Sequence, residues 1–91
     1  GPETITGRAQ ILAEFKIDNL RVAGCKCTEG EIFKTDSVRV GDKLTKIKSL
    51  KIGKNEVEKI KTGQEFGVVF SPPVDFKVGD TIIAVTIHGA S

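Results

Sequence analysis

Apolar and polar residues alternate along much of the chain, which is the pattern of half-buried β-strands. Residues 4–15 follow this period of two, with Leu12 as the one departure. The Asp18-Asn19 pair predicts a turn, and residues 20–27 then predict a second strand. Gly24 inside that strand indicates a close backbone approach or a bulge. The chain therefore opens on two strands joined by a short turn.

The rest of the chain gives further strand and turn signals. Glu29-Gly30 predicts a break, and residues 35–37 a turn. Residues 38–44 and 76–82 share an apolar-basic-Val-Gly-Asp pattern, and each copy should bend the chain and start a strand, over residues 43–50 and 81–87. Residues 65–70 predict another strand, followed by a Ser-Pro-Pro loop. Residues 55–61 fit either a short helix or a short strand.

Six or seven short strands with glycine turns predict an all-β fold. A small antiparallel barrel suits this pattern best, because closure removes the exposed edges of an open sheet. A sandwich is the alternative.

A length of 91 residues predicts one domain. The chain has no methionine and starts with Gly1-Pro2, so we interpret it as an excised piece with a cleavage remnant or flexible start at residues 1–3. Residues 4–87 should form a single β-barrel domain, and residues 88–91 a flexible tail. No apolar run is long enough to span a bilayer, so we expect no membrane partner.

Positive charge is concentrated in one segment. Residues 43–61 carry seven lysines against Glu56 and Glu58, an excess of five positive charges, whereas the rest of the chain has a net charge of −3. Such a basic patch is expected of a surface that binds phosphates. The alternative is a solvated face whose lysines protect edge strands.

The residues indicate no catalytic or metal chemistry. Cys25 and Cys27 are two apart, so they should lie on one strand face as free thiols, which suits a reducing cytoplasm. His88 is the only histidine, too few for a zinc site and without the context of a catalytic triad. A phosphate-binding glycine loop is also missing. We therefore expect neither an enzyme nor a cofactor.

Several short motifs, in this order, resemble the C-terminal domain of bacterial-type translation initiation factor 2. They are Ala-Gly-Cys at 23–25, Thr-Glu-Gly-Glu-Ile at 28–32, Ile-Lys-Ser-Leu-Lys at 47–51, Glu-Val at 56–57, Gly-Gln-Glu-Phe-Gly at 63–67 and Gly-Asp-Thr-Ile at 79–82. Single motifs are shared with the second domain of elongation factor Tu, which stays an alternative. The order and spacing favour the initiation factor, over roughly residues 4–85.

The resemblance implies a closed six-stranded barrel that binds the formylmethionyl-adenosine end of initiator transfer RNA. It implies no catalysis by this domain, a ribosome partner through the parent protein, and a monomeric isolated domain. Three stretches, residues 24–25, 51–54 and 65–67, would have to converge to form the pocket, with Lys51 and Lys54 facing phosphates. The implied binding residues are Gly24, Cys25, Lys51, Ile52, Gly53, Lys54, Glu65, Phe66 and Gly67.

Three features differ from the family pattern. Phe66 stands where a second pocket cysteine is usual, Ile52-Gly53 replaces a basic and an aromatic residue, and the hairpin after Val40 is shorter. Phe66 would be a core residue, an apolar wall or a side chain that narrows the pocket, and we expect narrowing and weak binding. The alternative function is a spacer or protein-interaction barrel that has lost the pocket.

Overall fold

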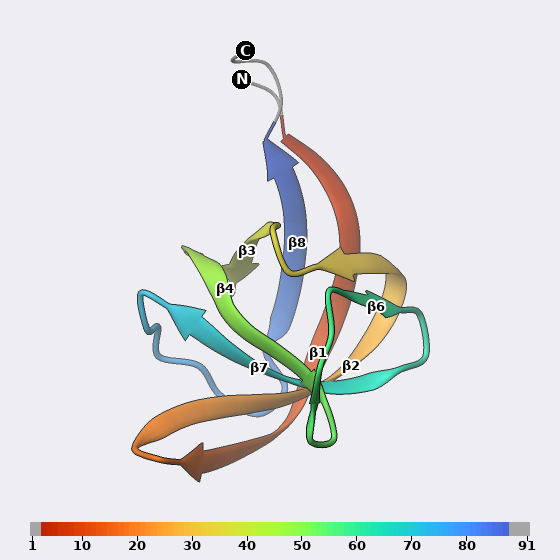
Figure 1. The fold of residues 1–91 in the computed structure, drawn as a ribbon. Helices are drawn as coiled ribbons and strands as arrows, with labels where there is room; N and C mark the ends of the chain where they lie inside the picture. Colours follow the sequence, from red (N-terminus) through yellow and green to blue (C-terminus); the bar gives the residue numbers. More distant parts are fainter. Residues whose placement is uncertain (1–2, 88–91) are drawn as a thin grey trace.

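The computed structural model describes residues 3–87, and within these residues it contains strands and no helix. Eight strands follow one another along the chain (Figure 1). They are β1 (Glu3–Ile17), β2 (Leu20–Phe33), β3 (Ser37–Val40), β4 (Lys43–Ile52), β5 (Asn55–Glu56), β6 (Lys59–Lys61), β7 (Glu65–Ser71) and β8 (Thr81–Ile87). The expected remnant and tail lie outside the described residues, apart from residue 3.

Six of these strands close into an antiparallel barrel, in the order β1-β8-β3-β4-β7-β2. The pairing of β1 with β2 completes the ring, and every pairing in it is antiparallel. This closure confirms the six-stranded barrel and is incompatible with a sandwich of two separate sheets. The short strands β5 and β6 pair with the ends of β4 and β2.

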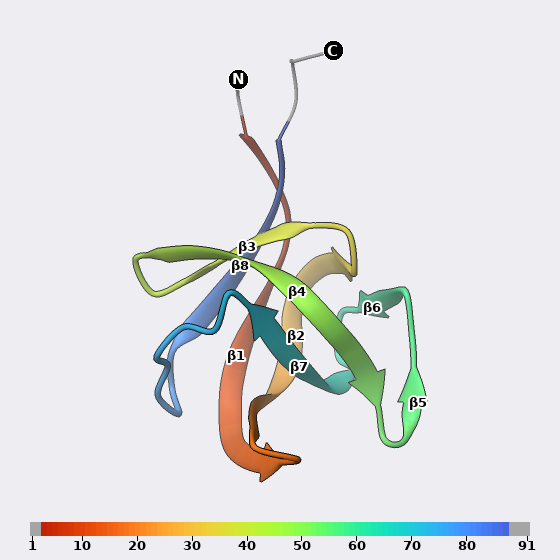
Figure 2. The same cartoon turned by 60° about the vertical axis from the view of Figure 1, so that its left-hand side comes forward.

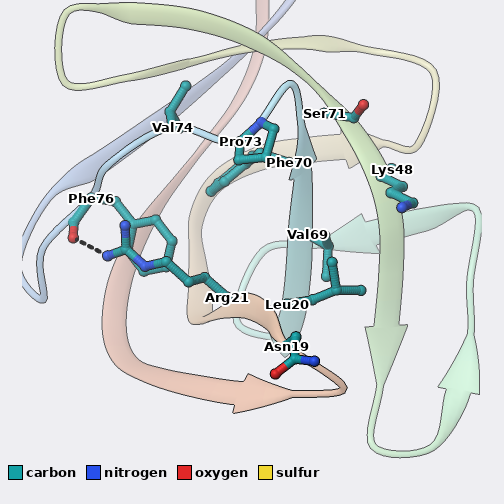
Figure 3. Close-up of a pocket in the computed structure, with 10 residues that line it drawn as sticks. All are labelled: Asn19, Leu20, Arg21, Lys48, Val69, Phe70, Ser71, Pro73, Val74 and Phe76. Carbon is teal, nitrogen blue, oxygen red and sulfur yellow. Dashed lines mark hydrogen bonds between the residues drawn. The ribbon is translucent and has the colours of Figure 1, made fainter.

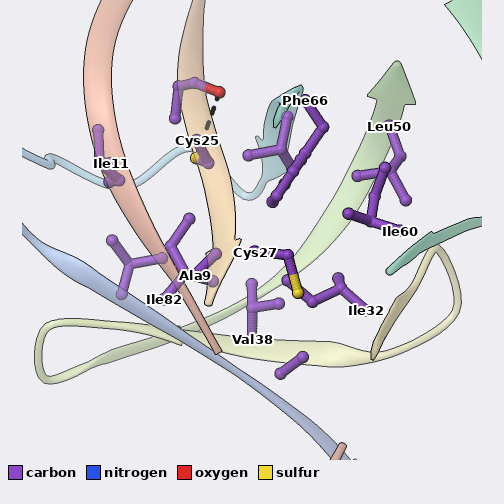
Figure 4. Close-up of a cluster of buried hydrophobic side chains, with 14 of the residues drawn as sticks. Ala9, Ile11, Cys25, Cys27, Ile32, Val38, Leu50, Ile60, Phe66 and Ile82 are labelled. Carbon is purple, nitrogen blue, oxygen red and sulfur yellow. Dashed lines mark hydrogen bonds between the residues drawn. The ribbon is translucent and has the colours of Figure 1, made fainter. Parts of the chain in front are cut away.

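The barrel interior is filled by the apolar residues of the alternating pattern. β7 shows this clearly, because Phe66, Val68 and Phe70 are buried whereas Glu65 and Ser71 are exposed. Cys25 and Cys27 point into the same core as free thiols, as their spacing predicted. The core residues labelled in Figure 4 are Ala9, Ile11, Cys25, Cys27, Ile32, Val38, Leu50, Ile60, Phe66 and Ile82.

The structure corrects one local prediction and decides between the two alternatives left open for another segment. Glu29-Gly30 does not end a strand, because β2 continues through it to Phe33. Gly30 adopts a φ of 62° and pairs with Gly7, so the strand bends there without losing its partner. Residues 55–61 form the two short strands β5 and β6 and no helix, since their backbone groups pair with β4 and β2.

One buried carboxylate joins three strands at the end of the barrel where β1 begins and β8 ends. Asp36, which is 5% exposed, accepts hydrogen bonds from the hydroxyls of Thr6 on β1 and Thr86 on β8, at 2.7 and 3.1 Å. It also accepts one from the backbone N–H of Phe33, at 3.0 Å. Because all three donors are satisfied by one side chain, Asp36 fixes this end of the barrel.

The β1–β2 hairpin lies at the opposite end and projects from the barrel (Figure 2). Asp18 and Asn19 form its turn with φ values of 52° and 65°, the conformation of a two-residue turn that matches the twist of the strands. Leu12 lies in a register shift between Ile11 and Ala13 and is 47% exposed. Its departure from the sequence alternation therefore marks a β-bulge.

The two copies of the Gly-Asp pattern act as predicted but differently. Gly41-Asp42 is the turn between β3 and β4, and Gly41 has a φ of 63°. Gly79-Asp80 bends the loop that follows β7 and leads it into β8. Both copies start a strand, and only the first makes a hairpin.

Candidate functional site

The three stretches that the sequence indicated as a site meet on neighbouring strands. Gly67 of β7 pairs with Gly24 of β2 on one side and with Lys51 of β4 on the other. Cys25 pairs in turn with Phe66. Residues separated by more than forty positions in the chain are thus adjacent in one sheet, because β7 lies between β2 and β4.

A hollow of about 450 Å³ lies over this sheet, and six of the nine expected residues line it. Among the other three, Lys51 lines a smaller adjoining hollow and Ile52 packs against the barrel core. Lys54 is exposed in the turn between β4 and β5 and lines neither hollow. The lining residues are Leu12, Ala13, Phe15, Ile17, Val22, Gly24, Cys25, Gly53, Glu65, Phe66 and Gly67.

The apolar walls of the hollow come from the β1–β2 hairpin, which sequence reasoning did not include. Leu12, Phe15 and Ile17 are 47%, 54% and 57% exposed, although their side chains are large and hydrophobic. Neighbouring exposed apolar side chains of this kind mark binding surfaces more often than isolated ones do. The signal in the sequence was the group of apolar residues next to the Asp18-Asn19 turn, where polar residues would be expected.

Two glycines in the sheet provide the space in which these walls pack. A Cβ atom at Gly24 would lie 2.8 Å from Cε2 of Phe15, so the Phe15 ring rests over the bare backbone of β2. A Cβ at Gly67 would lie 3.3 Å from Cγ1 of Val22. The expected close backbone approach at Gly24 is therefore a contact with an aromatic ring.

Phe66 and Cys25 line the hollow but belong to the core. Their exposed fractions are 6% and 2%, and both are members of the buried cluster (Figure 4). Burial raises the pKa of the Cys25 thiol to about 12, and burial also raises the pKa of Cys27. Since the thiolate is the nucleophilic form, neither cysteine is activated for covalent chemistry.

The electrostatics of the site come from exposed lysines and one carboxylate. Lys48 and Lys51 have no carboxylate within salt-bridge distance in residues 3–87, whereas Lys59 lies 3.5 Å from Glu31. Glu65 is exposed and is the one ionisable carboxylate lining the hollow. Residues 3–87 hold no cluster of three metal-ligating side chains.

Arg21 fastens the hairpin to the loop between β7 and β8. Its guanidinium donates hydrogen bonds to Glu14 at 2.7 Å, to Asp75 at 2.9 Å and to the carbonyl oxygen of Phe76 at 2.9 Å. It also lies 4.3 Å from the centre of the Phe76 ring. These hydrogen bonds from Arg21 lower the pKa values of Glu14 and Asp75. The walls of the hollow are thus held against the barrel.

No helix in residues 3–87 could cross a bilayer. The fold and the hollowed sheet face define a small closed-barrel domain, and a solved structure shares this fold. It is the crystal structure of GDP-bound aIF5B from Aeropyrum pernix, with a TM-score of 0.73 over 86% of this chain and 16% of that chain. At 15% sequence identity, this likeness shows the fold alone.

Sequence similarity is more specific. The chain is 40% identical to translation initiation factor IF-2 of Caulobacter vibrioides over 94% of its length, 42% identical to that of Bartonella bacilliformis over 88%, and 38% identical to that of Brucella ovis over 98%. It is a homologue of one segment of translation initiation factor IF-2, which confirms the family resemblance. The chain spans 9 to 10% of the length of these relatives. No family model matches it.

Proposed function

We propose that this domain binds the formylmethionyl-adenosine 3′ end of initiator transfer RNA. The observation that carries the proposal is the hollow itself, which joins the expected binding residues on β2 and β7 to the exposed apolar walls of the hairpin. A hollow of about 450 Å³ has the size of a small-ligand site. Its apolar walls suit the methionyl side chain, which would lie against Leu12, Phe15 and Ile17.

The same walls provide a physical basis for preferring the formylated amino acid. Formylation removes the positive charge of the α-amino group, and a neutral formamide loses much less solvation than an ammonium in an apolar site. Glu65 would accept a hydrogen bond from the formamide N–H at the mouth of the hollow. Because Glu65 is exposed, its attraction for an ammonium is weakened by solvent and does not offset the desolvation.

Lys51 would contact the phosphate next to the terminal adenosine, from the hollow that adjoins the first. Such contacts add affinity without reading sequence. In this proposal the domain performs no catalysis, acts in the cytoplasm, and reaches the ribosome through the protein of which it is a segment.

Titration of the isolated domain with formylmethionyl-adenosine and with methionyl-adenosine tests the proposal. The formylated ligand should bind at least roughly tenfold more tightly, because burying an unpaired ammonium costs more than about 1.4 kcal/mol. Equal binding of the two ligands would refute the formyl preference, and absence of binding would refute the function.

A second experiment uses whole initiator transfer RNA. Lys51→Ala should lower the slope of log K against log salt by about one unit, as expected for one lost phosphate contact. Lys61→Ala is the matched control, because Lys61 is exposed on β6 and lines no hollow of the site. Equal slopes for the two variants would mean that the basic segment is only a solvated face.

The exposed apolar hairpin also suits a second candidate, a protein-interaction barrel. Leu12, Phe15 and Ile17 would then contact the surface of a partner protein instead of a methionyl group. Failure of every aminoacyl-nucleoside ligand to bind would favour this candidate.

A further inference from the structure

The outer edge of the β1–β2 hairpin is an open strand edge. β1 pairs with β8 as far as Gln10, and the backbone of Ile11 then bonds to Gly79 and Asp80. Within the described part of the chain, residues 13–17 pair with β2 alone, so their other edge has no partner strand. Such an edge is a template for pairing with a strand of another molecule.

The turn of the hairpin determines which residues direct their backbone groups to this edge. In a two-residue turn the C=O before the loop accepts a hydrogen bond from the N–H after it, so the backbone groups of Ile17 face Leu20. Backbone groups alternate in direction along an antiparallel strand, so those of Phe15 also face β2. Glu14 and Lys16 therefore direct their N–H and C=O groups to the open edge.

The charges of these two residues select one way in which a second copy of the chain can pair here. Their outward groups can meet those of a second copy in three symmetric antiparallel registers. Two registers place Glu14 opposite Glu14 or Lys16 opposite Lys16, and like charges directly opposite one another destabilise paired strands. The third register centres the two-fold axis on Phe15 and places Glu14 of each copy opposite Lys16 of the other. The edge is therefore complementary to itself in charge and in backbone hydrogen bonding.

The apolar side chains of β1 fit the same register. Successive side chains on a strand alternate between faces, so Ala13, Phe15 and Ile17 share the face opposite to the two charged residues. In the register centred on Phe15, Ala13 of each copy lies opposite Ile17 of the other, so that a small residue meets a large one. The exposed Phe15 and Ile17 side chains of the two copies then form one apolar row.

The hairpin presents this edge in a fixed position. Arg21 donates hydrogen bonds to Glu14 and Asp75 and, as Figure 3 shows, to the carbonyl oxygen of Phe76. A strand edge that is fixed before binding loses less conformational freedom on pairing. The hairpin also projects beyond the barrel, so two barrels joined at these edges lie at opposite ends of the contact (Figure 2).

We propose that the chain forms a symmetric dimer through this edge, with β1 of one copy antiparallel to β1 of the other. The strands β2-β1-β1-β2 then form one continuous sheet. The contact covers about five residues of each copy, far less than a standard interface, so the dissociation constant should be roughly 0.1–1 mM. A monomer at low concentration, as the resemblance implies, is compatible with this dimer. The dimer needs no transfer RNA and does not depend on the proposed function.

Sedimentation equilibrium and NMR of the 91-residue chain test the dimer directly. The mean mass should rise from monomer toward dimer between roughly 0.01 and 2 mM. Over the same range the amide resonances of Glu14 and Lys16 should shift more than that of Phe15, because only the first two N–H groups gain an acceptor. A monomer throughout, or shifts confined to other strands, would overturn the proposal.

Charge exchange tests the register. Lys16→Glu places a glutamate opposite Glu14, and Glu14→Lys places a lysine opposite Lys16, so each variant alone should dimerise roughly tenfold more weakly. An equal mixture of the two variants again pairs opposite charges at both positions and should recover the affinity of the unaltered chain within about threefold. Lys61→Glu is the matched control, because it makes the same charge change on β6 and should leave the dimer unchanged.

The outcomes distinguish strand pairing from other association. A dimer that is insensitive to both charge changes would show contact through the apolar walls of the hollow instead and would overturn the proposal, as would a mixture that fails to recover. Thermal unfolding checks that each variant folds, and the NMR measurement on the unaltered chain decides the matter if Glu14→Lys does not. Binding of formylmethionyl-adenosine is measured on the dilute monomer, so either proposal can fail without the other.

Discussion

Replacement of Gly24 by alanine should separate folding from binding. The added Cβ would lie 2.8 Å from Cε2 of Phe15, which is closer than two carbon atoms pack. An ordinary carbon–carbon contact is about 3.5 Å, so the Phe15 ring must move outward by more than about half an ångström. Phe15 is 54% exposed, so its ring has room to rotate away. The φ of Gly24 is not in the left-handed region, so alanine fits the backbone.

The expected change in stability is small because two effects oppose each other. Displacing Phe15 from its rotamer costs about 0.5–1.5 kcal/mol. Replacing glycine by alanine at a compatible site contributes about 0.4–1 kcal/mol through the unfolded chain. The net change in the free energy of unfolding should stay within about 1 kcal/mol, which corresponds to about 4–8 °C in Tm for a domain of this size.

The expected change in binding is larger. Phe15 forms one wall of the first hollow, and its displacement removes apolar contact worth about 1–2 kcal/mol, or roughly a 5-fold to 30-fold loss of affinity for formylmethionyl-adenosine. Thermal unfolding by circular dichroism and titration of the same sample provide the two measurements. Gly53→Ala is unsuitable as a control because Gly53 has a φ of 62°. A fully folded Gly24→Ala protein with unchanged affinity would refute this account of the hollow.

Three further predictions concern buried groups. Phe66→Cys should lower the free energy of unfolding by about 2–4 kcal/mol in denaturant titration, since Phe66 is 6% exposed, and should tighten binding of the formylated ligand if Phe66 narrows the hollow. Cys25 has a pKa of about 12 in the fold against 9.0 for an ordinary thiol, so the unfolded chain ionises first as pH rises. Cys25 should therefore lower stability by up to about 1.4 kcal/mol per pH unit between these values, and Cys25→Ala should reduce the measured slope and leave the part that comes from Cys27. Asp36→Ala should cost about 2–4 kcal/mol, because it leaves the Phe33 N–H and the Thr86 hydroxyl without an acceptor while the Thr6 hydroxyl keeps only the carbonyl oxygen of Ala84; an unchanged Tm would contradict the role of Asp36.

The sequence predicted the barrel because its signals are local. Alternation in β1 and β7, the Asp18-Asn19 turn and the two Gly-Asp patterns each depend on a few neighbouring residues, and all agree on short antiparallel strands. Glu29-Gly30 misled the prediction for a physical reason. A glycine with positive φ ends some strands, but here it bends β2 opposite Gly7 without interrupting the pairing. Whether Gly30 breaks or bends the strand depends on that distant partner.

The candidate site was predictable only in part. Motif resemblance identified residues on β2, β4 and β7, and the structure brings most of them to one hollow. It did not identify Leu12, Phe15 or Ile17, because an apolar residue on a strand is normally assigned to the core. Their exposure follows from the register shift at Leu12 and from the projection of the hairpin beyond the barrel. The structure places Lys48 beside hollows along β7, whereas Lys54 lines neither hollow of the candidate site, and spacing along the chain alone does not show which lysines lie there.

The site depends on closure of the whole barrel and not on any single hairpin. Gly24 and Gly67 are neighbours because β2 and β7 pair, and Lys51 joins them because β7 and β4 pair, although β7 follows neither strand directly in the chain. The pairing of β1 with β2 closes the ring of strands, and Gly7 faces Gly30 in this pairing. A Cβ at Gly7 would lie against the backbone of Glu29 and Glu31. This paired backbone cannot move aside, whereas the exposed Phe15 ring can. Two glycines in the same barrel therefore have different roles. Gly7 permits the ring to close, and Gly24 shapes the hollow that closure creates, so loss of the first should abolish folding and binding together.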